Sequence, residues 1–265
     1  MLKEILQKKK LFVFDMDGTV YLGSKVFDFA VSFIKKLRAN GYRVLFFTNN
    51  ASHNPDFYQK KLTRMGFEPQ AGEILTSGDV TIAFLKSHRP GQACYLVGTE
   101  ELCHQFREAG ITLSETAPIV VTSFDTTLTY EKLDIACRLV RGGAEYLSTH
   151  PDYNCPTEDG FIPDSGAIAA FVTASTGVSP TYFGKPYRTA MAMMGEITAT
   201  EPEDIVIFGD RLYTDIALGK RNGVTAVLVL TGETTEADVE AAFPEDRPDY
   251  TVPSLREMDR LLFEA

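Results

Sequence analysis

The sequence is short of cysteine, histidine and long apolar runs, and each shortage excludes a class of protein. Its four cysteines include no C-x-x-C spacing and are too few for a disulfide scaffold in 265 residues, so we expect reduced thiols. The four histidines include no H-E-x-x-H or similar spacing, which argues against zinc chemistry. The apolar run Leu11–Phe14 is far shorter than the hydrophobic region of a signal peptide, and nothing later approaches a membrane span. We therefore expect a cytoplasmic protein.

Basic charge is also scarce. Lysine and arginine number 26 against 36 aspartates and glutamates, which gives a net charge of −10, and the only dense basic run is Lys8-Lys9-Lys10. A chain this acidic repels a phosphate backbone or an anionic membrane, so we expect neither as a partner. A small phosphorylated substrate stays compatible with the sequence, because a metal and local groups can reverse the field inside a cleft. The ordinary apolar content of 44% indicates a globular chain of one or two domains.

Short apolar runs alternate with helical periodicity along most of the chain. This alternation predicts an α/β fold built on a doubly wound, Rossmann-like parallel sheet with helices on both faces. The predicted strands are Leu11–Phe14, Arg43–Phe47, Ile74–Thr76, Ala93–Val97, Ile119–Thr122, Glu145–Ser148, Ile205–Phe208 and Ala226–Leu230. The predicted helices include Glu100–Ala109, Tyr130–Arg141, Tyr187–Thr198 and Asp215–Asn222, one from Asp79, and one that opens at Asn54-Pro55 and ends near Gly66.

Two breaks with turn chemistry enclose a segment that has its own strand and helix pattern. They are Arg89-Pro90-Gly91 and Ser179-Pro180. We predict a core formed by residues 1–88 and 181–265, with residues 89–180 as an inserted α/β domain.

The strongest motif is Asp15-Met16-Asp17-Gly18-Thr19, directly after a predicted buried strand. A turn explains Gly18, but not two carboxylates at the end of an apolar strand, where each loses hydration unless it has a partner. A hard cation is the natural partner. Mg²⁺ takes oxygen ligands and is commonly held by one or two carboxylates together with a substrate phosphate.

Three further segments are each weak signals alone. Thr48-Asn49-Asn50 offers a hydroxyl and backbone N–H groups to phosphate oxygens, and Gly184-Lys185-Pro186 offers a positive charge. The run from Gly209 to Asp215 places two more acids, Asp210 and Asp215, after an apolar strand. Ordinary helix capping would account for Asp215 but poorly for Asp210.

Most of these segments share one position: directly after a predicted strand. Asp15, Thr48 and Asp210 each follow a predicted strand immediately or by one residue. Ligands of open α/β sheets bind outside the carboxyl ends of the strands, so the sequence predicts one crevice that gathers these side chains.

With these motifs in this order the chain resembles the haloacid dehalogenase (HAD) superfamily of phosphotransferases. The matching segments are Asp15-x-Asp17-Gly18-Thr19, Thr48, Lys185 and Gly209-Asp210-x-x-x-x-Asp215. The long insert is similar to the superfamily's type II cap. The segments around Asp15, Thr48 and Asp210 are similar to those of the NagD and 4-nitrophenylphosphatase branch.

The resemblance implies a role for each of these residues. Asp15 would be the nucleophile that forms an aspartyl-phosphate, and Asp17 the acid and base, with its backbone carbonyl on the metal. Asp15, Asp210 and Asp215 would complete the Mg²⁺ site, Asp215 by ordering the ligands around it. The phosphate or substrate would be held by Thr48, Asn49, Asn50, Lys185 and Arg211.

The resemblance further implies a phosphatase acting on a small phosphorylated metabolite: a sugar phosphate, phosphoglycolate or a nucleotide-like ester, with 4-nitrophenyl phosphate as an artificial substrate. Asp17 favours a phosphatase over a dehalogenase, which has no need of that acid. Two alternatives stay open: a phosphotransferase or phosphomutase on the same site, and a non-enzymatic phosphoacceptor like a receiver domain. A homodimer through the inserted domain is also left open.

Selectivity for the rest of the substrate would come from the insert. The segment Thr149-His150-Pro151-Asp152 follows a predicted strand and presents a titratable ring and an acid on a loop stiffened by proline. We predict that His150 and Asp152 contact substrate, against the alternative that His150 is merely a solvated residue of a capped loop.

Overall fold

The computed structural model describes residues 2–157 and 160–264 and divides the chain into two compact units. The first comprises Met1–Thr48, Tyr58–Leu75 and Met194–Ala265, and the second comprises Asn49–Phe57 and Thr76–Met193. The units are described separately below.

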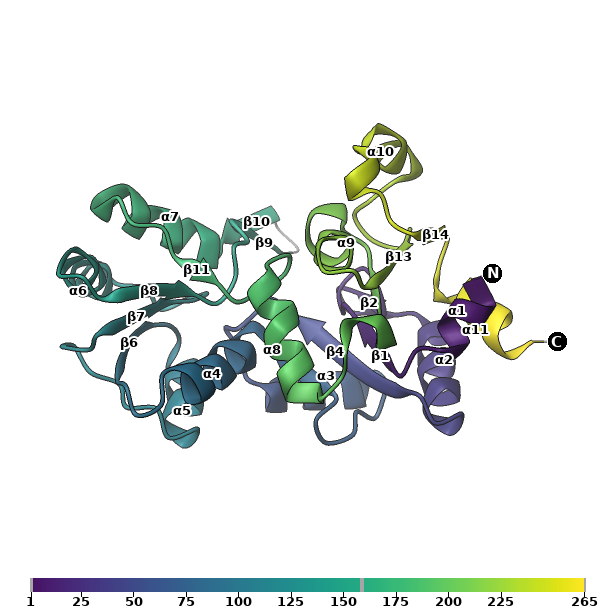
Figure 1. Ribbon diagram of the computed structural model, residues 1–265, viewed down its shortest axis with the longest axis horizontal. Coiled ribbons are helices and arrows are strands. Elements are labelled where there is room, and N and C mark those ends of the chain that lie inside the picture. The colour runs from purple at the N-terminus through teal and green to yellow at the C-terminus, as the bar shows by residue number, and fades with distance from the viewer. Residues whose placement is uncertain (1, 158–159, 265) are drawn as a thin grey trace. The chain divides into compact units, whose positions relative to one another are not determined.

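The first unit is built on a six-stranded parallel sheet (Figure 1). Its strand order is β14 (Tyr250–Val252), β13 (Thr225–Val229), β12 (Ile205–Gly209), β1 (Leu11–Phe14), β4 (Arg43–Thr48) and β5 (Ile74–Thr76). The central strand β1 has no exposed residue, because it pairs with β12 on one side and β4 on the other. A small hairpin, β2 (Tyr21–Leu22) and β3 (Lys25–Val26), follows β1.

Helices cover both faces of this sheet. On one face a continuous apolar core joins the strands to the helices α1 (Leu2–Gln7), α2 (Asp28–Ala39), α3 (Pro55–Arg64) and α11 (Leu255–Phe263). Phenylalanines dominate it: the rings of Phe12, Phe14 and Phe208 stack across β1 and β12, and Phe33 of α2 meets two of them edge-on. A smaller cluster around Ile216, Ala226 and Leu228 covers part of the other face. The remaining elements of this unit are η1 (Pro202–Asp204), η2 (Leu212–Ile216), α9 (Ala217–Arg221), α10 (Glu236–Ala241) and η3 (Pro244–Asp246).

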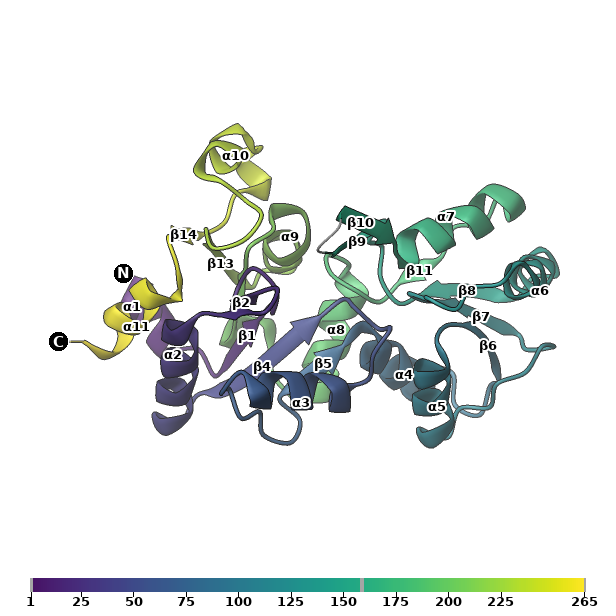
Figure 2. The ribbon, with the colours of Figure 1, turned by 180° about the vertical axis from the view of Figure 1, so that it is seen from behind.

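The second unit has its own four-stranded parallel sheet. Its order is β11 (Thr181–Tyr182), β8 (Glu145–Ser148), β7 (Ile119–Thr122) and β6 (Cys94–Val97). The helices α6 (Tyr130–Arg141) and α7 (Ser165–Thr176) share an apolar core with these strands, and Figure 2 shows α7 on one side of β7 and β8 and α5 (Glu100–Glu108) on the other. An antiparallel hairpin, β9 (Asn154–Thr157) and β10 (Gly160–Pro163), lies between β8 and α7 in the chain. The unit also contains α4 (Ser77–His88), and the division between the units falls within α3 and α8 (Arg188–Thr198).

The predicted fold class is confirmed: each unit is built on a parallel sheet with helices on its faces. Several elements begin and end where the sequence predicts, among them β1, β5, β7, β8 and α6. The helix predicted from Asp79 begins at Ser77, since Thr76 is its N-cap and Asp79 completes a capping box. The helix predicted at Asp215–Asn222 is preceded by a π-helical turn, Leu212–Ile216, that carries Asp215.

The predicted insert, residues 89–180, holds nearly all of the four-stranded sheet, which runs from Cys94 to Tyr182. The compact unit around that sheet also takes in residues 49–57, 76–88 and 181–193. The interpretation of the two units as a core and an inserted domain stays a prediction. No helix in the described part of the chain combines the length and apolar character that a bilayer crossing requires.

Candidate active site

Asp15 and Asp17 lie in the loop that leaves β1. The backbone N–H of Asp15 donates to the carbonyl of Phe208 at 2.9 Å, so this residue continues the pairing of β1 with β12. Asp15 is partly buried, whereas Asp17 is exposed and accepts a long 3.5 Å bond from the N–H of Gly23. The strand therefore fixes the first carboxylate, and the turn after it presents the second to solvent.

Gly18 allows a second carboxylate to approach this loop. Its φ is +83°, in the left-handed region that favours glycine, and a Cβ atom at this position would overlap the carboxylate of Asp210. The hydroxyl of Thr231 donates to the carbonyl of Gly18 at 2.6 Å and fixes the turn. Gly18 in the motif is thus required by both the turn and the close approach of Asp210.

Asp210 and Asp215 come from the carboxyl end of β12 and the π-helical turn after it. Both are buried, and one carboxylate oxygen each of Asp15, Asp210 and Asp215 lie within 4.8 Å of one another. The structure thus brings together three acids from segments almost two hundred residues apart. This grouping at the ends of β1 and β12 is the arrangement that the sequence predicts.

The acidic cluster is electrostatically strained. Burial, together with the negative charges of Asp15 and Asp215, raises the pKa of Asp210 to about 7. The N–H of Glu233 donates to Asp210 Oδ2 at 2.7 Å, but Asp210 Oδ1 is buried without a hydrogen-bond partner. A buried carboxylate oxygen without a partner, facing two more carboxylates, fits a hard divalent cation coordinated by oxygen.

Arg211 supplies positive charge next to the cluster. Burial acts to lower the pKa of its guanidinium, but the charge of Asp15 and the neighbouring acids outweighs burial and raises it. Its Nε forms an ion pair with Glu233 at 3.0 Å, and the hydroxyl of Tyr213 donates to the same glutamate at 2.8 Å. The substrate-binding role predicted for Arg211 stays a prediction. Glu233, which bonds both Asp210 and Arg211, was missed because it stands 23 residues after Asp210 with no motif around it.

Tyr21 and Lys61 lie near Asp17, and no motif in the sequence distinguishes them. Tyr21 is buried, and its phenol pKa is raised by burial and by the charges of Asp17 and Asp15. The ammonium of Lys61 lies 4.1 Å from the centre of the Tyr21 ring, a cation–π distance. Burial lowers the pKa of Lys61, and Asp17 acts in the opposite direction.

The segment Thr48-Asn49-Asn50 follows β4, and its residues have separate environments. Thr48 is the last residue of the strand and is partly buried. Asn49 is buried, whereas Asn50 is partly exposed and its side-chain oxygen accepts from the N–H and hydroxyl of Ser52 at 2.9 and 2.7 Å. Asn50 therefore stabilises its own turn, and its assignment to phosphate or substrate stays a prediction.

Lys185 is buried in the second unit, and its backbone is held by Asn49. The N–H of Lys185 donates to Asn49 Oδ1 at 2.7 Å, and Asn49 Nδ2 donates to the Lys185 carbonyl at 3.0 Å. These two bonds define which end of the Asn49 amide is oxygen. The same Nδ2 donates to Asp152 Oδ2 at 3.0 Å. The structure thus joins three predicted site residues, Asn49, Asp152 and Lys185, in one network.

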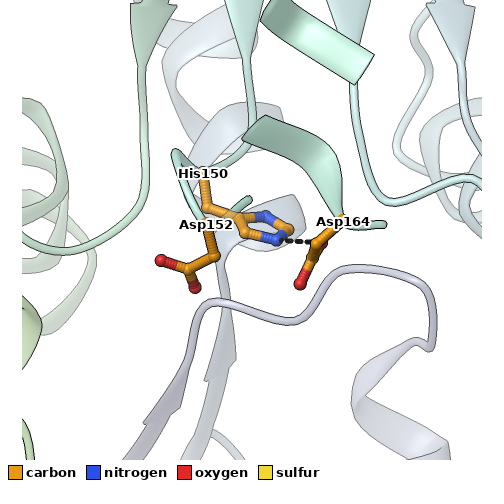
Figure 3. Close-up of side chains that lie close together, drawn as sticks. All are labelled: His150, Asp152 and Asp164. Atoms are coloured by element: carbon orange, nitrogen blue, oxygen red, sulfur yellow. Dashed lines mark hydrogen bonds and ion pairs between the residues drawn. The ribbon is translucent and has the colours of Figure 1, made fainter. Parts of the chain in front are cut away.

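His150 and Asp152 leave the end of β8 on one loop (Figure 3). His150 is completely buried, and its Nε2 lies 2.8 Å from Asp164 Oδ1, whereas Asp152 is partly exposed. Burial acts to lower the pKa of His150, but Asp164 outweighs it and raises the pKa. Their contact with substrate stays a prediction. A merely solvated His150, the alternative considered from sequence, is excluded by its burial.

Asp164 is a further residue that sequence reasoning missed. It is the N-cap of α7, accepting from the N–H of Ser165 at 2.5 Å as well as from His150. The available signal was an aspartate directly before a helix, but α7 is rich in alanine, serine and threonine and shows little amphipathic periodicity.

Comparison with known proteins gives consistent matches over nearly the whole chain. Residues 12–112 match a family model described as haloacid dehalogenase-like hydrolase, and residues 182–258 match a second, HAD-hydrolase-like model. A relative named acid sugar phosphatase, from Staphylococcus aureus, is 36% identical over 89% of this chain and 92% of its own length. The crystal structure of a 4-nitrophenylphosphatase from Thermotoga maritima has a TM-score of 0.92 and 39% identity, covering 97% of this chain and 99% of that one. A p-nitrophenyl phosphatase from Archaeoglobus fulgidus has a TM-score of 0.89 and 30% identity, covering 95% and 98%.

Proposed function

Since the chain belongs to the haloacid dehalogenase-like hydrolases and is a phosphatase, we propose that it hydrolyses phosphate monoesters of sugars through a phosphorylated Asp15 with the help of Mg²⁺. The observation that carries this proposal is the group of Asp15, Asp210 and Asp215, whose oxygens lie within 4.8 Å of one another at the ends of β1 and β12. Relatives named acid sugar phosphatase support the substrate class, and those named 4-nitrophenylphosphatase support 4-nitrophenyl phosphate as an artificial substrate.

The donor set fits Mg²⁺. Asp15 and Asp210 would hold it through their carboxylates and Asp17 through its backbone carbonyl, with Asp215 ordering the cluster. When bound, the ion neutralises negative charge on the phosphoryl group and on the three acids. The buried oxygen Asp210 Oδ1, which has no hydrogen-bond partner, is the observation that supports this fit.

The first chemical step belongs to Asp15 and Asp17. A carboxylate oxygen of Asp15 attacks phosphorus, and the bond from phosphorus to the leaving oxygen breaks. The carboxyl group of Asp17 gives its proton to that oxygen, so that a neutral sugar hydroxyl departs. Asp17 suits this work because it is exposed on the turn directly after Asp15.

The second step returns the enzyme to its starting state. Asp17, now a carboxylate, accepts a proton from a water molecule whose oxygen attacks phosphorus. The phosphorus–oxygen bond to Asp15 breaks, and inorganic phosphate and the free Asp15 carboxylate result. Asp17 ends the cycle protonated, as it began.

The negatively charged phosphoryl oxygens need hydrogen-bond donors and positively charged side chains around them. The residues proposed for this are Thr48, the backbone of Asn49, Lys185 and Arg211. The Thr48 hydroxyl stands at the end of β4, and the Arg211 pKa stays above its ordinary value, so that the guanidinium is charged. The backbone of Lys185 is fixed by two bonds to Asn49, which limits where its side chain can reach.

Phosphate release from a panel of esters tests the proposal. The panel comprises sugar phosphates, phosphoglycolate, nucleoside monophosphates and 4-nitrophenyl phosphate, each assayed after treatment with a chelator and again with added Mg²⁺. We expect release that depends on Mg²⁺ and is fastest, as kcat/KM, for a sugar phosphate. Full activity of the chelated protein would contradict the metal assignment. A preference for another ester would overturn the substrate class but leave the mechanism standing.

A further inference from the structure

His150 is the centre of a buried polar network in the second unit. Its imidazole is directed at Asp164, with Asp152 on the same loop (Figure 3). On the other side of the ring, Nδ1 lies 3.0 Å from the hydroxyl of Thr149 and 3.3 Å from that of Ser77. Every polar atom of the ring therefore has a neighbour inside the protein.

The neighbours of the ring are themselves held by hydrogen bonds. The Thr149 hydroxyl donates to Ser123 Oγ at 3.0 Å, and the Ser77 hydroxyl donates to the carbonyl of Asn49. Both hydroxyls are thus fixed beside Nδ1, while Asp164 offers a carboxylate to Nε2. The ring is therefore held at both of its nitrogens.

This arrangement argues against a metal site here, although oxygens of Asp152 and Asp164 and a ring nitrogen of His150 lie within 4.8 Å of one another. A metal ligand needs a free nitrogen lone pair, and both ring nitrogens already face hydrogen-bond partners inside the protein. Asp152 and Asp164 are also already bonded, to Asn49 and to the N–H of Ser165. The group is a set of paired polar side chains.

The network ends at the backbone of Lys185. Gly184 packs so closely on His150 and on Asn49 that a Cβ atom at this position would overlap both. Asn49 receives a bond from Ser77 at its carbonyl and forms two bonds with the Lys185 backbone through its side chain. A shift of His150 would therefore change the surface against which Gly184, the residue before Lys185, is packed.

We propose that His150 is a positioning residue for Lys185: its pair with Asp164 fixes the loop 149–152 against Gly184 and Asn49 and so holds the lysine in place. The ring acts through Lys185 and touches no substrate, which departs from the role predicted for it from sequence. The kinetic consequence rests on the proposed function, in which Lys185 binds the phosphoryl group.

A positioning role has a distinctive kinetic signature. Every substrate carries the same phosphoryl group. Displacement of Lys185 therefore weakens the binding of every substrate by one common factor. An interaction lost equally from bound substrate and transition state raises KM and leaves kcat nearly unchanged. The inhibition constant for inorganic phosphate should rise by that same factor, because phosphate uses the same lysine.

The test compares His150→Met with His150→Gln. The two side chains are similar in length, but only glutamine can donate to Asp164 as Nε2 does. His104→Met is the matched control, because His104 forms an exposed ion pair with Glu108 in the same unit. We expect His150→Met to raise KM about tenfold for every ester, and the other two variants to stay within about threefold of the wild type.

Hydrogen exchange of the Lys185 N–H gives a readout that does not depend on activity. This amide donates to Asn49, so its exchange in a peptide spanning residues 181–187 should be faster in His150→Met than in His150→Gln, with unchanged exchange in the first unit. Equal exchange in the two variants would overturn the proposal whatever the protein hydrolyses. Faster exchange with no common rise in KM would support the positioning of the backbone and contradict the role of Lys185 in phosphate binding. A KM change that differs between leaving groups would overturn the proposal, because it would show that His150 contacts the substrate directly.

Discussion

At the scale of single residues, the chemistry is concentrated in carboxylates whose surroundings differ sharply. Asp210 is buried beside Asp15 and Asp215, whereas Asp17, on the turn after β1, is exposed to solvent. The first environment penalises negative charge and so favours a cation. The second leaves the Asp17 carboxyl group accessible from solvent. Sequence spacing predicted both residues, but only the structure distinguishes their environments.

The raised pKa of Asp210 predicts how the metal-free protein responds to pH. The folded-state pKa of about 7 lies above the value of about 3.9 for an unfolded aspartate, so between these values the native state binds more protons. The contribution of Asp210 to stability is therefore lost as pH rises from about 4 to 7. In a chelator, Asp210→Asn should unfold at higher urea concentration than the wild type at pH 8, by on the order of 1–3 kcal/mol in free energy of unfolding, with the difference gone near pH 4. Added Mg²⁺ should reverse the order at pH 8. A variant less stable than the wild type in chelator would contradict the electrostatic account.

The proposed role of Asp17 predicts that its replacement affects the two chemical steps to different extents. Asp17→Asn should lower kcat for sugar phosphates by about 10²–10⁴, because both proton transfers are lost. The 4-nitrophenolate group needs little protonation, so its departure should stay fast while hydrolysis of the phosphorylated enzyme becomes slow. Rapid-mixing measurements should then show a burst of 4-nitrophenolate close to one equivalent per enzyme. The matched Asp15→Asn variant should show no burst, and equal bursts from both variants would remove Asp15 from the role of nucleophile.

At the scale of elements, site residues at the ends of strands were easier to predict from the sequence than those beside helices. The carboxyl ends of β1 and β12 bring Asp15 and Asp210 together because parallel pairing fixes their register. Elements with a capping residue and an apolar stripe, such as α6 with Thr129 at its N-cap, were predictable residue by residue. The helix α7 and the hairpin β9–β10 were missed, because α7 has little amphipathic pattern and the hairpin residues are largely exposed. Asp164, which depends on α7, could not be placed without them.

Gly18, in the turn after β1, and Gly41, between α2 and β4, form a matched pair of glycines. Gly18 and Gly41 both have φ of +83°, but only Gly18 lies against another side chain, that of Asp210. Gly41→Ala should cost about 1–2 kcal/mol of free energy of unfolding from backbone strain alone. Gly18→Ala should cost more, because its Cβ displaces Asp210, and it should also weaken Mg²⁺ binding, which calorimetry can measure. Equal destabilisation of the two variants with unchanged metal binding would contradict the close approach described here.

At the scale of the whole molecule, the net charge of −10 is compatible with a phosphatase, because the cation proposed for the cluster of acids would reverse the local field there. The alternation of strand and helix patterns predicted the fold class, and the order of the motifs predicted the enzyme class; the family matches and relatives confirm both. The substrate could not be predicted in the same way. The sequence also did not reveal the environments of His150 and Asp152, because their burial and partners follow from tertiary packing and leave no local pattern.

The central claim is that the phosphoryl group is carried on Asp15, and trapping it there is the most direct test. The Asp17→Asn variant, which should form the phosphorylated enzyme and release it slowly, would be mixed with 4-nitrophenyl phosphate and Mg²⁺ and quenched in acid. Digestion at low pH and mass spectrometry would then locate the phosphate. The account predicts one phosphate on the peptide that contains Asp15, and none in the protein when Asp15→Asn is added. Phosphate on any other residue, or turnover with no phosphorylated peptide at all, would contradict it.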